Sequence, residues 1–165
     1  MSRRKHIIGI MGAGQASERS LSAARQLGRL VAERGWIVLT GGRPEGVMAA
    51  ACAGAKSVPG SVTLGILPSA SGGVGEDVDI AVFTGLGDAR NAINVLTSDV
   101  VVACGVEGPG TASEVALALK SERPILLLGA SNDAVAFFRR VAGHVRLREA
   151  ATAEDAMRVL EELLG

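Results

Sequence analysis

Aromatic side chains are nearly absent from this 165-residue chain, which has no Tyr, one Trp and three Phe. A core without aromatic rings has to be filled by Val, Ile, Leu and Ala. Such a core is typical of layered α/β proteins, whose central strands are buried on both faces. Glycine, in contrast, is abundant, with 22 residues, and several of these follow predicted strands. The length and composition therefore predict a single α/β domain that spans residues 1–165.

Features of metal sites and of charged partners are also scarce. Cys52 and Cys104 lie inside apolar segments and the two histidines stand apart, so we expect no metal site and no redox pair. Basic and acidic residues balance at 17 each, which favours neither nucleic acid nor a membrane surface as a partner. We expect residues 1–5 to form a basic, flexible tail. The apolar run after them is too short for a signal peptide or a membrane span, which predicts a cytoplasmic protein.

Short apolar runs alternate with helical patterns along the chain. Strands are expected at 6–11, 36–40, 61–67, 80–83, 99–104, 124–128 and, weakly, 145–147. Helices are expected at 18–34, 47–56, 88–98 with Asp88 as N-cap, 115–120, 133–142 and 153–164. Right-handed crossovers between successive strands then give a Rossmann-like, doubly wound sheet. The sheet should be mostly parallel and form the middle of three layers, with helices on both faces.

Four loops follow the carboxyl ends of these strands, at 12–17, 41–46, 84–90 and 105–114. The parallel topology brings them to one rim, where doubly wound proteins bind their ligands. The 105–114 loop leads from a buried strand into a helix, so its free N–H groups and the helix dipole suit a phosphate. The same residues are also compatible with a simple tight turn. The longest irregular stretch, 68–77, is a candidate lid over this rim.

Two common nucleotide-binding motifs fit poorly. The 12–17 loop resembles the dinucleotide fingerprint but lacks its third glycine, and no acidic residue follows Thr40 to hold a ribose. Arg43 is the one residue there that could meet a 2′-phosphate. An NAD-dependent oxidoreductase is therefore disfavoured. The absence of a Walker A loop excludes a P-loop NTPase.

Polar side chains at the start of two helices are candidates for the site. An arginine such as Arg90 can grip phosphate with its planar fork of donors. A carboxylate nearby, such as Glu114, can act as a general base or hold a ribose. Alternatively, these two side chains pair with each other or with helix ends. Asn91 and Asn94 lie one helical turn apart and either recognise a ligand or cap loops.

Three motifs resemble a known superfamily. They are Gly41-Gly42…Gly46-Val47-Met48, Gly87-Asp88-Ala89-Arg90-Asn91 and Gly108-Pro109-Gly110-Thr111-Ala112-Ser113-Glu114. Over residues 6–160 the chain resembles the Rossmann-like Lonely Guy superfamily, long mislabelled "lysine decarboxylases". Its nearest branch is similar to the molybdenum cofactor carrier protein of algae. The resemblance implies a doubly wound sheet, a homodimer or homotetramer, and a phosphate site at the Gly-Thr loop.

The resemblance also implies two different activities. Enzymatic members release a base from a nucleoside 5′-monophosphate with an arginine and a glutamate that align with Arg90 and Glu114. The carrier branch binds the molybdenum cofactor without turning it over. Asn91 stands where the enzymes have lysine, and Pro109 removes one N–H donor from the loop. Both departures disfavour a hydrolase and favour either a carrier or a protein that binds another, untested ligand.

Pyridoxal phosphate chemistry is rejected, because it needs a Schiff-base lysine in the pocket. The three lysines of the chain lie in the basic tail and at predicted helix C-termini, away from the rim; they are Lys5, Lys56 and Lys120. The chain is therefore not expected to be a lysine decarboxylase.

The sequence thus predicts a protein that binds a phosphorylated small molecule, a nucleotide or a molybdenum cofactor-like ligand, as a candidate carrier with no required cofactor. The alternative is a nucleoside 5′-monophosphate phosphoribohydrolase, in which Arg90 orients the substrate and Glu114 assists loss of the base. A homo-oligomer is expected, because helices 47–56 and 88–98 carry more apolar surface than one sheet face needs. The predicted ligand-binding residues are Gly12, Gly14, Gly41, Gly42, Arg43, Gly46, Asn91, Asn94, Gly108, Gly110 and Thr111.

Overall fold

The computed structural model describes residues 4–165, in which strands and helices alternate. The strands are β1 (Ile7–Met11), β2 (Ile37–Thr40), β3 (Thr63–Leu67), β4 (Ile80–Phe83), β5 (Val100–Cys104), β6 (Ile125–Leu128) and β7 (Leu147–Ala150). The helices are α1 (Glu18–Glu33), α2 (Gly46–Lys56), the 3₁₀ helix η1 (Gly87–Ala89), α3 (Arg90–Thr97), α4 (Pro109–Lys120), α5 (Asn132–Val141) and α6 (Ala153–Leu164). The first three residues of the predicted tail lie outside the described part, and Arg4 forms an ion pair with Asp99.

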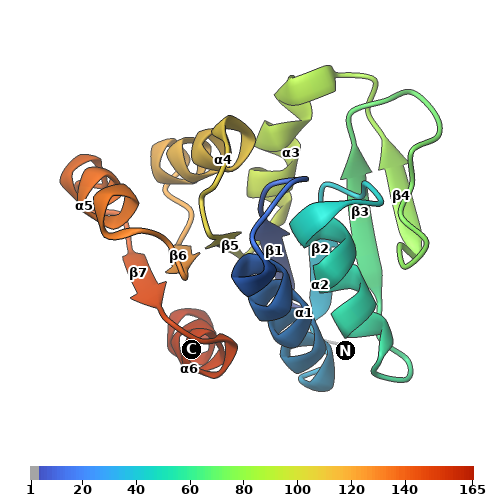
Figure 1. Ribbon diagram of the computed structural model, residues 1–165, viewed down its shortest axis with the longest axis horizontal. Helices are drawn as coiled ribbons and strands as arrows, with labels where there is room; N and C mark the ends of the chain where they lie inside the picture. The colour runs from blue at the N-terminus through green and yellow to red at the C-terminus, as the bar shows by residue number, and fades with distance from the viewer. Residues whose placement is uncertain (1–3) are drawn as a thin grey trace.

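The described strands form one sheet in the order β4-β3-β2-β1-β5-β6-β7, and every neighbouring pair is parallel. Figure 1 shows α3, α4 and α5 along the upper side of this sheet and α1, α2 and α6 along the lower side. The predicted three-layer, doubly wound fold is therefore confirmed. Strand order reverses between β1 and β5, so the loops after these two strands flank the topological switch point.

Two aliphatic clusters hold the layers together, one on each face of the sheet. Alternate residues of a strand point to opposite faces, so Ile8 and Ile10 pack against α1, α2 and α6. Met11 packs on the opposite face with residues of α3, α4 and α5. All five residues of β5 are buried, as expected for a central strand covered on both sides. Aliphatic side chains thus fill the core in place of aromatic rings.

Helices α1 and α2 approach each other backbone to backbone. A Cβ at Gly28 of α1 would lie 2.1 Å from the carbonyl oxygen of Ala51, and a Cβ at Gly54 of α2 would lie 1.9 Å from that of Arg25. Most of α2 is buried in this contact and against the sheet. The small residues of helix 47–56 therefore serve packing within the chain, and they leave little apolar surface for self-association.

Two predicted helix starts are wrong. Helix α4 begins at Pro109 rather than near 115, because proline suits the first helical position, where its missing N–H costs no bond. Asp88 does not cap a helix: it lies inside η1, and neither η1 nor α3 has a side-chain cap. The edge strand β7 also begins at Leu147 instead of 145, since Val145 still belongs to a turn that bonds back to Ala142.

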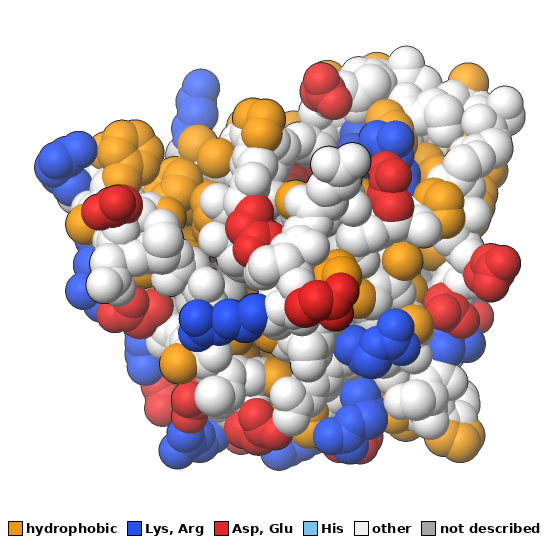
Figure 2. Space-filling model, viewed as in Figure 1, with side chains coloured by type: hydrophobic (Ala, Val, Ile, Leu, Met, Phe, Trp, Pro, Cys, Tyr) orange, Lys and Arg blue, Asp and Glu red, His pale blue; other side chains and the backbone are white. Residues whose placement is uncertain are grey.

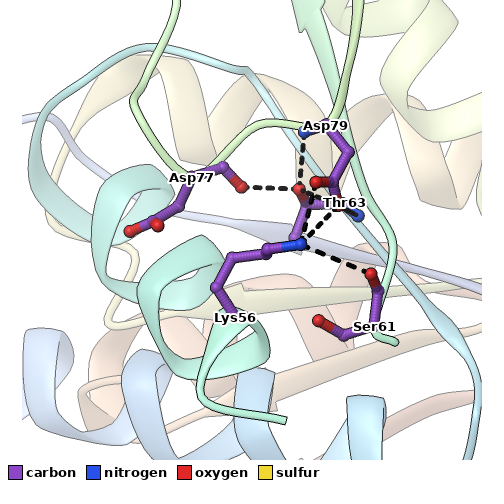
Figure 3. Close-up of polar contacts among 5 residues, drawn as sticks. All are labelled: Lys56, Ser61, Thr63, Asp77 and Asp79. Atoms are coloured by element: carbon purple, nitrogen blue, oxygen red, sulfur yellow. Dashed lines mark hydrogen bonds and ion pairs between the residues drawn. The ribbon is translucent and has the colours of Figure 1, made fainter. Parts of the chain in front are cut away.

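The connection from β3 to β4 contains no helix and is anchored where it returns to the sheet (Figure 3). Lys56 at the end of α2 donates to Asp79 at 2.8 Å, and the same carboxylate accepts from the backbone N–H of Thr63 at 2.8 Å. The hydroxyl of Thr63 donates to the carbonyl oxygen of Asp77 at 2.5 Å. This cluster fixes the base of the irregular 68–77 stretch. None of the helices in residues 4–165 has the length and apolar character needed to cross a membrane.

Candidate functional site

A cavity of about 230 Å³ lies at the carboxyl ends of β1, β2 and β5. Residues from all four predicted rim loops line it, together with the first turns of α2, α3 and α4. The lining residues are Met11, Gly12, Ala13, Gly14, Gly41, Arg43, Met48, Asp88, Arg90, Asn91, Gly108, Pro109, Gly110, Thr111 and Glu114. The predicted convergence of the four loops is therefore observed, as the parallel topology requires. Figure 2 shows acidic and basic side chains interspersed over the viewed face.

The helices that begin at this cavity lack side-chain caps. Helices α2, α3 and α4 have no cap hydrogen bond from a side chain, whereas Ser131 and Thr152 cap α5 and α6, which begin elsewhere. At α4 the N-cap is Gly108 and the first helical residue is Pro109. The N–H groups of Gly110 and Thr111 are then among the free donors of this helix end. An uncapped helix start on a cavity is a suitable anion cradle.

Thr111 adds a second observation at the same place. This residue is only 2% exposed, and its hydroxyl oxygen is buried without a hydrogen-bond partner. A buried hydroxyl without a partner costs about 1–3 kcal/mol. Because Thr111 lines the cavity in the first turn of α4, a ligand oxygen there would satisfy it. The Gly-Thr loop thus combines an uncapped helix start with a buried hydroxyl that lacks a partner.

Arg90 is held at the ends of two strands. Its Nη1 donates to the carbonyl oxygens of Gly41 at 2.8 Å and Ile66 at 2.5 Å, while its Nε is buried without a partner. A Cβ at Gly41 would lie 2.4 Å from this Nη1, so glycine is required for the approach. Burial, aided by Arg43, lowers the pKa of Arg90, and Glu114 partly opposes this effect. The guanidinium is therefore an immobilised cation at the cavity wall.

Glu114 is the buried acid of the cavity, with only 7% of its surface exposed. Burial raises its pKa to about 7, although the hydrogen bond from Asn94 and the charge of Arg90 both act in the opposite direction. The Nδ2 of Asn94 donates to Oε1 of Glu114 at 2.9 Å, and the Oδ1 of this asparagine is buried without a partner. Near neutral pH this carboxyl group can hold or release a proton, which suits general acid–base work.

The two asparagines connect α3 to α4. Asn91 lines the cavity and donates to the hydroxyl of Ser113 at 3.0 Å, and Ser113 donates in turn to the carbonyl oxygen of Gly110. Asn94 lies behind the cavity wall, where it holds Glu114. Of the alternatives that the sequence left open, neither asparagine caps a loop. Arg90 donates to carbonyl oxygens at the ends of two strands, and Glu114 accepts from the amide of Asn94. Arg90 and Glu114 are therefore each held by other groups and do not pair directly.

Two further glycines predicted as ligand contacts do not line this cavity. A Cβ at Gly42 would lie 3.0 Å from the Cα of Gly65, and one at Gly46 would lie 2.1 Å from the carbonyl oxygen of Ala13. Both positions favour glycine because the backbone approaches closely there and because their φ angles of +74° and +59° lie in the left-handed region. Gly12 and Gly14 do line the cavity, as do the remaining predicted residues apart from Asn94. Sequence reasoning missed Met48 and Asp88, although both stand within motifs quoted for the resemblance.

A larger hollow of about 650 Å³ adjoins the cavity and shares Arg43 and Met48 with it. Its walls come from α1, α2 and residues 75–78. Arg43 stands between the two spaces with half of its side chain exposed, paired to Glu45 at 3.0 Å. A phosphate at α4 would therefore leave room for the rest of a larger ligand beyond Arg43. The two spaces together fall within the volume range of small-molecule sites.

Neither cysteine lines the smaller cavity, although Cys52 lines the larger hollow beside it. Both are buried, and burial raises the pKa of Cys104 to about 12 and also raises that of Cys52. Among residues 4–165, no three His, Cys, Asp or Glu side chains come together in a way that could hold a metal ion.

Comparison with known proteins shows the family of the chain and solved structures with the same fold. The model of the SLOG cluster4 family matches residues 5–157. An uncharacterized protein of Archaeoglobus fulgidus is 40% identical over 121 residues, which cover 73% of this chain and 78% of that protein. The structure of the molybdenum cofactor binding protein from the phototrophic bacterium Rippkaea orientalis superposes with a TM-score of 0.93 at 46% identity, over 99% of this chain and 100% of that one. The Moco carrier protein from Chlamydomonas reinhardtii superposes with a TM-score of 0.90 at 46% identity, over 98% of each chain.

Proposed function

The chain belongs to the SLOG cluster4 family, and we propose that it binds a phosphorylated small molecule and acts as a carrier for it. The ligand is a molybdenum cofactor-like compound or a nucleotide. The observation that carries the proposal is the buried, unpartnered hydroxyl of Thr111 in the uncapped first turn of α4. Structural neighbours that bind or carry the molybdenum cofactor support the first of these ligands.

The residues of the cavity fit such a ligand in kind. The free N–H groups of Gly110 and Thr111 and the Thr111 hydroxyl would hold its phosphate. Arg90 contributes fixed positive charge to the same cavity. When bound, the molybdenum cofactor supplies a phosphate and an oxyanion-bearing metal, and the hollow beyond Arg43 offers space for the part of the ligand that is not phosphate.

Ligand identification by mass and a Thr111 variant together test this proposal. We expect a phosphorylated small molecule to copurify with the protein. Phosphate, nucleotides or pterins added to the ligand-free protein should then raise its melting temperature. Thr111→Val keeps the side-chain shape and removes the hydroxyl, so phosphate affinity should fall by about tenfold, the cost of one hydrogen bond to a charged group. Thr97→Val, at the far end of α3, should leave it unchanged. Absence of any thermal shift with all three ligand classes would overturn the proposal.

A second candidate function rests on Glu114. A buried carboxyl with a pKa of about 7 on the wall of the proposed phosphate site could protonate a leaving base, as a nucleoside 5′-monophosphate phosphoribohydrolase requires. Free adenine released from AMP, and abolished by Glu114→Ala, would support this activity. Release of no base from any common nucleoside monophosphate would exclude it. Asn91 in place of a lysine weighs against it, since one cation is then missing from the cavity.

We also propose a homodimer or homotetramer. Leu96 at the end of α3 is 54% exposed, and Ile80 and Val82 of the edge strand β4 are 51% and 39% exposed. By strand register these two β4 residues lie opposite Leu64 and Ile66, on the sheet face that α3 covers, so the exposed apolar side chains share one side of the molecule. Light scattering that gave a monomer mass near 16.8 kDa would contradict this. The balanced charge favours a protein without a nucleic-acid partner.

A further inference from the structure

Glu107, in the loop between β5 and α4, reaches across to the start of α1. Its Oε2 accepts from the backbone N–H of Ser17 at 3.0 Å, and its Oε1 accepts from the hydroxyls of Ser17 at 2.6 Å and Ser20 at 3.1 Å. Ser17 is the N-cap of α1, and Ser20 is buried. A carboxylate of this chain therefore occupies the start of α1, held by three donors.

This position is the one that a dinucleotide would need. In doubly wound folds the pyrophosphate of a dinucleotide lies at the start of the first helix, in the crevice at the topological switch point. Here that crevice lies between the loops after β1 and β5, and Glu107 spans it. A Cβ at Gly108 would lie 3.7 Å from the Cβ of Ala13, so the two loops lie close together. The cavity between these two loops extends towards β2 and α4, where Gly41, Arg43 and Thr111 line it.

The backbone just before Glu107 is strained, so the contact between Glu107 and α1 is maintained at a cost in conformational energy. Gly105 and Val106 have φ angles of +79° and +56°, and a β-branched residue rarely adopts the left-handed region. Such a residue persists only where its surroundings fix it. The three hydrogen bonds of Glu107 to α1 supply such a constraint. Hydrogen bonds from Ser17 also lower the pKa of Glu107, against the effect of its burial, so its carboxyl group is ionised at neutral pH.

We propose that Glu107 determines ligand specificity: its carboxylate closes the start of α1, so the cavity accepts a single phosphate group at α4 and excludes the pyrophosphate of a dinucleotide. The inference rests on the proposed phosphate site at α4, which it deepens. Two features of Glu107 act together. Its hydrogen bonds use the donors of Ser17 and Ser20, and its negative charge repels a second phosphate placed beside the first.

Binding of AMP, NAD and inorganic pyrophosphate to the full chain and its variants tests this. Calorimetric titration of the wild type should show binding of AMP and negligible binding of the other two. Glu107→Ala frees the donors of α1, so affinity for NAD and pyrophosphate should rise at least tenfold while that for AMP changes less than threefold. Glu33→Ala, at the opposite end of the same helix, removes the same charge and should change none of the three. Unaltered affinity for both NAD and pyrophosphate in Glu107→Ala would overturn the inference.

The probes separate this inference from the proposed function. Pyrophosphate reports on the start of α1 directly, so its gain in Glu107→Ala supports the role of Glu107 even where AMP binds to no variant, a result that would contradict only the α4 site. Glu107→Gln provides the same comparison if the alanine variant does not fold, because it keeps the side-chain size and removes the charge. It too should gain pyrophosphate affinity, and the absence of that gain would count against the inference.

Discussion

Replacing Glu114 by glutamine is expected to stabilise the protein above pH 7 and to have little effect on stability below pH 4.5. Burial raises the pKa of this carboxyl group from 4.5 to about 7 on folding. Below pH 4.5 both the folded and the unfolded chain carry the proton, and burial of the neutral group costs no charge. As the pH rises from 4.5 to 7, the unfolded chain gives up its proton first, so the free energy of unfolding falls. Above pH 7 the loss is complete.

The size of the effect follows from these two values. A pKa difference of one unit corresponds to 1.36 kcal/mol, so a rise from 4.5 to about 7 corresponds to a cost of about 3 kcal/mol. Glutamine resembles the protonated acid in shape and cannot ionise, and therefore avoids this cost at every pH. Such an amount is a large fraction of the total stability of a typical domain.

Urea denaturation of the wild type and of Glu114→Gln, followed by circular dichroism from pH 4 to pH 8, measures the effect. The difference in free energy of unfolding between the two proteins should grow by about 3 kcal/mol across this range, and most of the growth should lie between pH 4.5 and 7. Taking the difference cancels the contributions of all other carboxyl groups, Glu107 included. A difference for Glu114→Gln that is flat with pH would refute the argument from burial.

Three further predictions concern neighbouring parts of the fold. Asn94→Leu removes the hydrogen bond that lowers the pKa of Glu114, so the midpoint of the same stability curve should move to higher pH; an unchanged or lower midpoint would contradict the role given to the amide. Gly28→Ala places a Cβ 2.1 Å from the carbonyl oxygen of Ala51 and should lower the free energy of unfolding by about 1–3 kcal/mol in the same denaturation assay; a neutral effect would show that α1 and α2 can move apart. Cys104, whose thiol has a pKa of about 12, should react with Ellman's reagent only after unfolding in guanidinium chloride, and rapid labelling of the folded protein would contradict its burial.

The fold was largely predictable because the strands from β1 to β6 are apolar runs between turn residues, whereas β7, with Arg148 and Glu149, is not. In β5 all five side chains are buried, and the continuous apolar run Val100–Cys104 predicts this buried strand without an alternative. The start of α4 was harder to place, since Gly-Pro-Gly is typical both of a turn and of an N-cap followed by a first-turn proline. A local pattern cannot separate these. Whether Gly-Pro-Gly forms a turn or begins the helix depends on whether the loop after β5 can lead directly back over the sheet.

The candidate site was predictable in its location and less so in its contacts. Parallel topology alone brings the four loops together. The partners of Arg90 are carbonyl oxygens of Gly41 and Ile66, and main-chain acceptors leave no signature in the side-chain pattern. The small residues of helix 47–56 were likewise read as surplus apolar surface. Their role depends on Gly28, which lies on another helix and allows the backbones to touch.

The hydrogen bonds that hold Arg90 and Glu114 in place bear on the choice between a carrier and a hydrolase. A hydrolase needs its charged groups to act on the reacting bond. Here the Nη1 of Arg90 bonds to two carbonyl oxygens, so the guanidinium acts as a fixed wall, and only its Nε is left without a partner. Glu114, with a pKa of about 7, is neutral in a large fraction of molecules at physiological pH and then does not repel a phosphate at α4. The immobilised guanidinium therefore favours the proposed carrier, whereas the titratable carboxyl group of Glu114 is the feature of this wall that the alternative hydrolase would use.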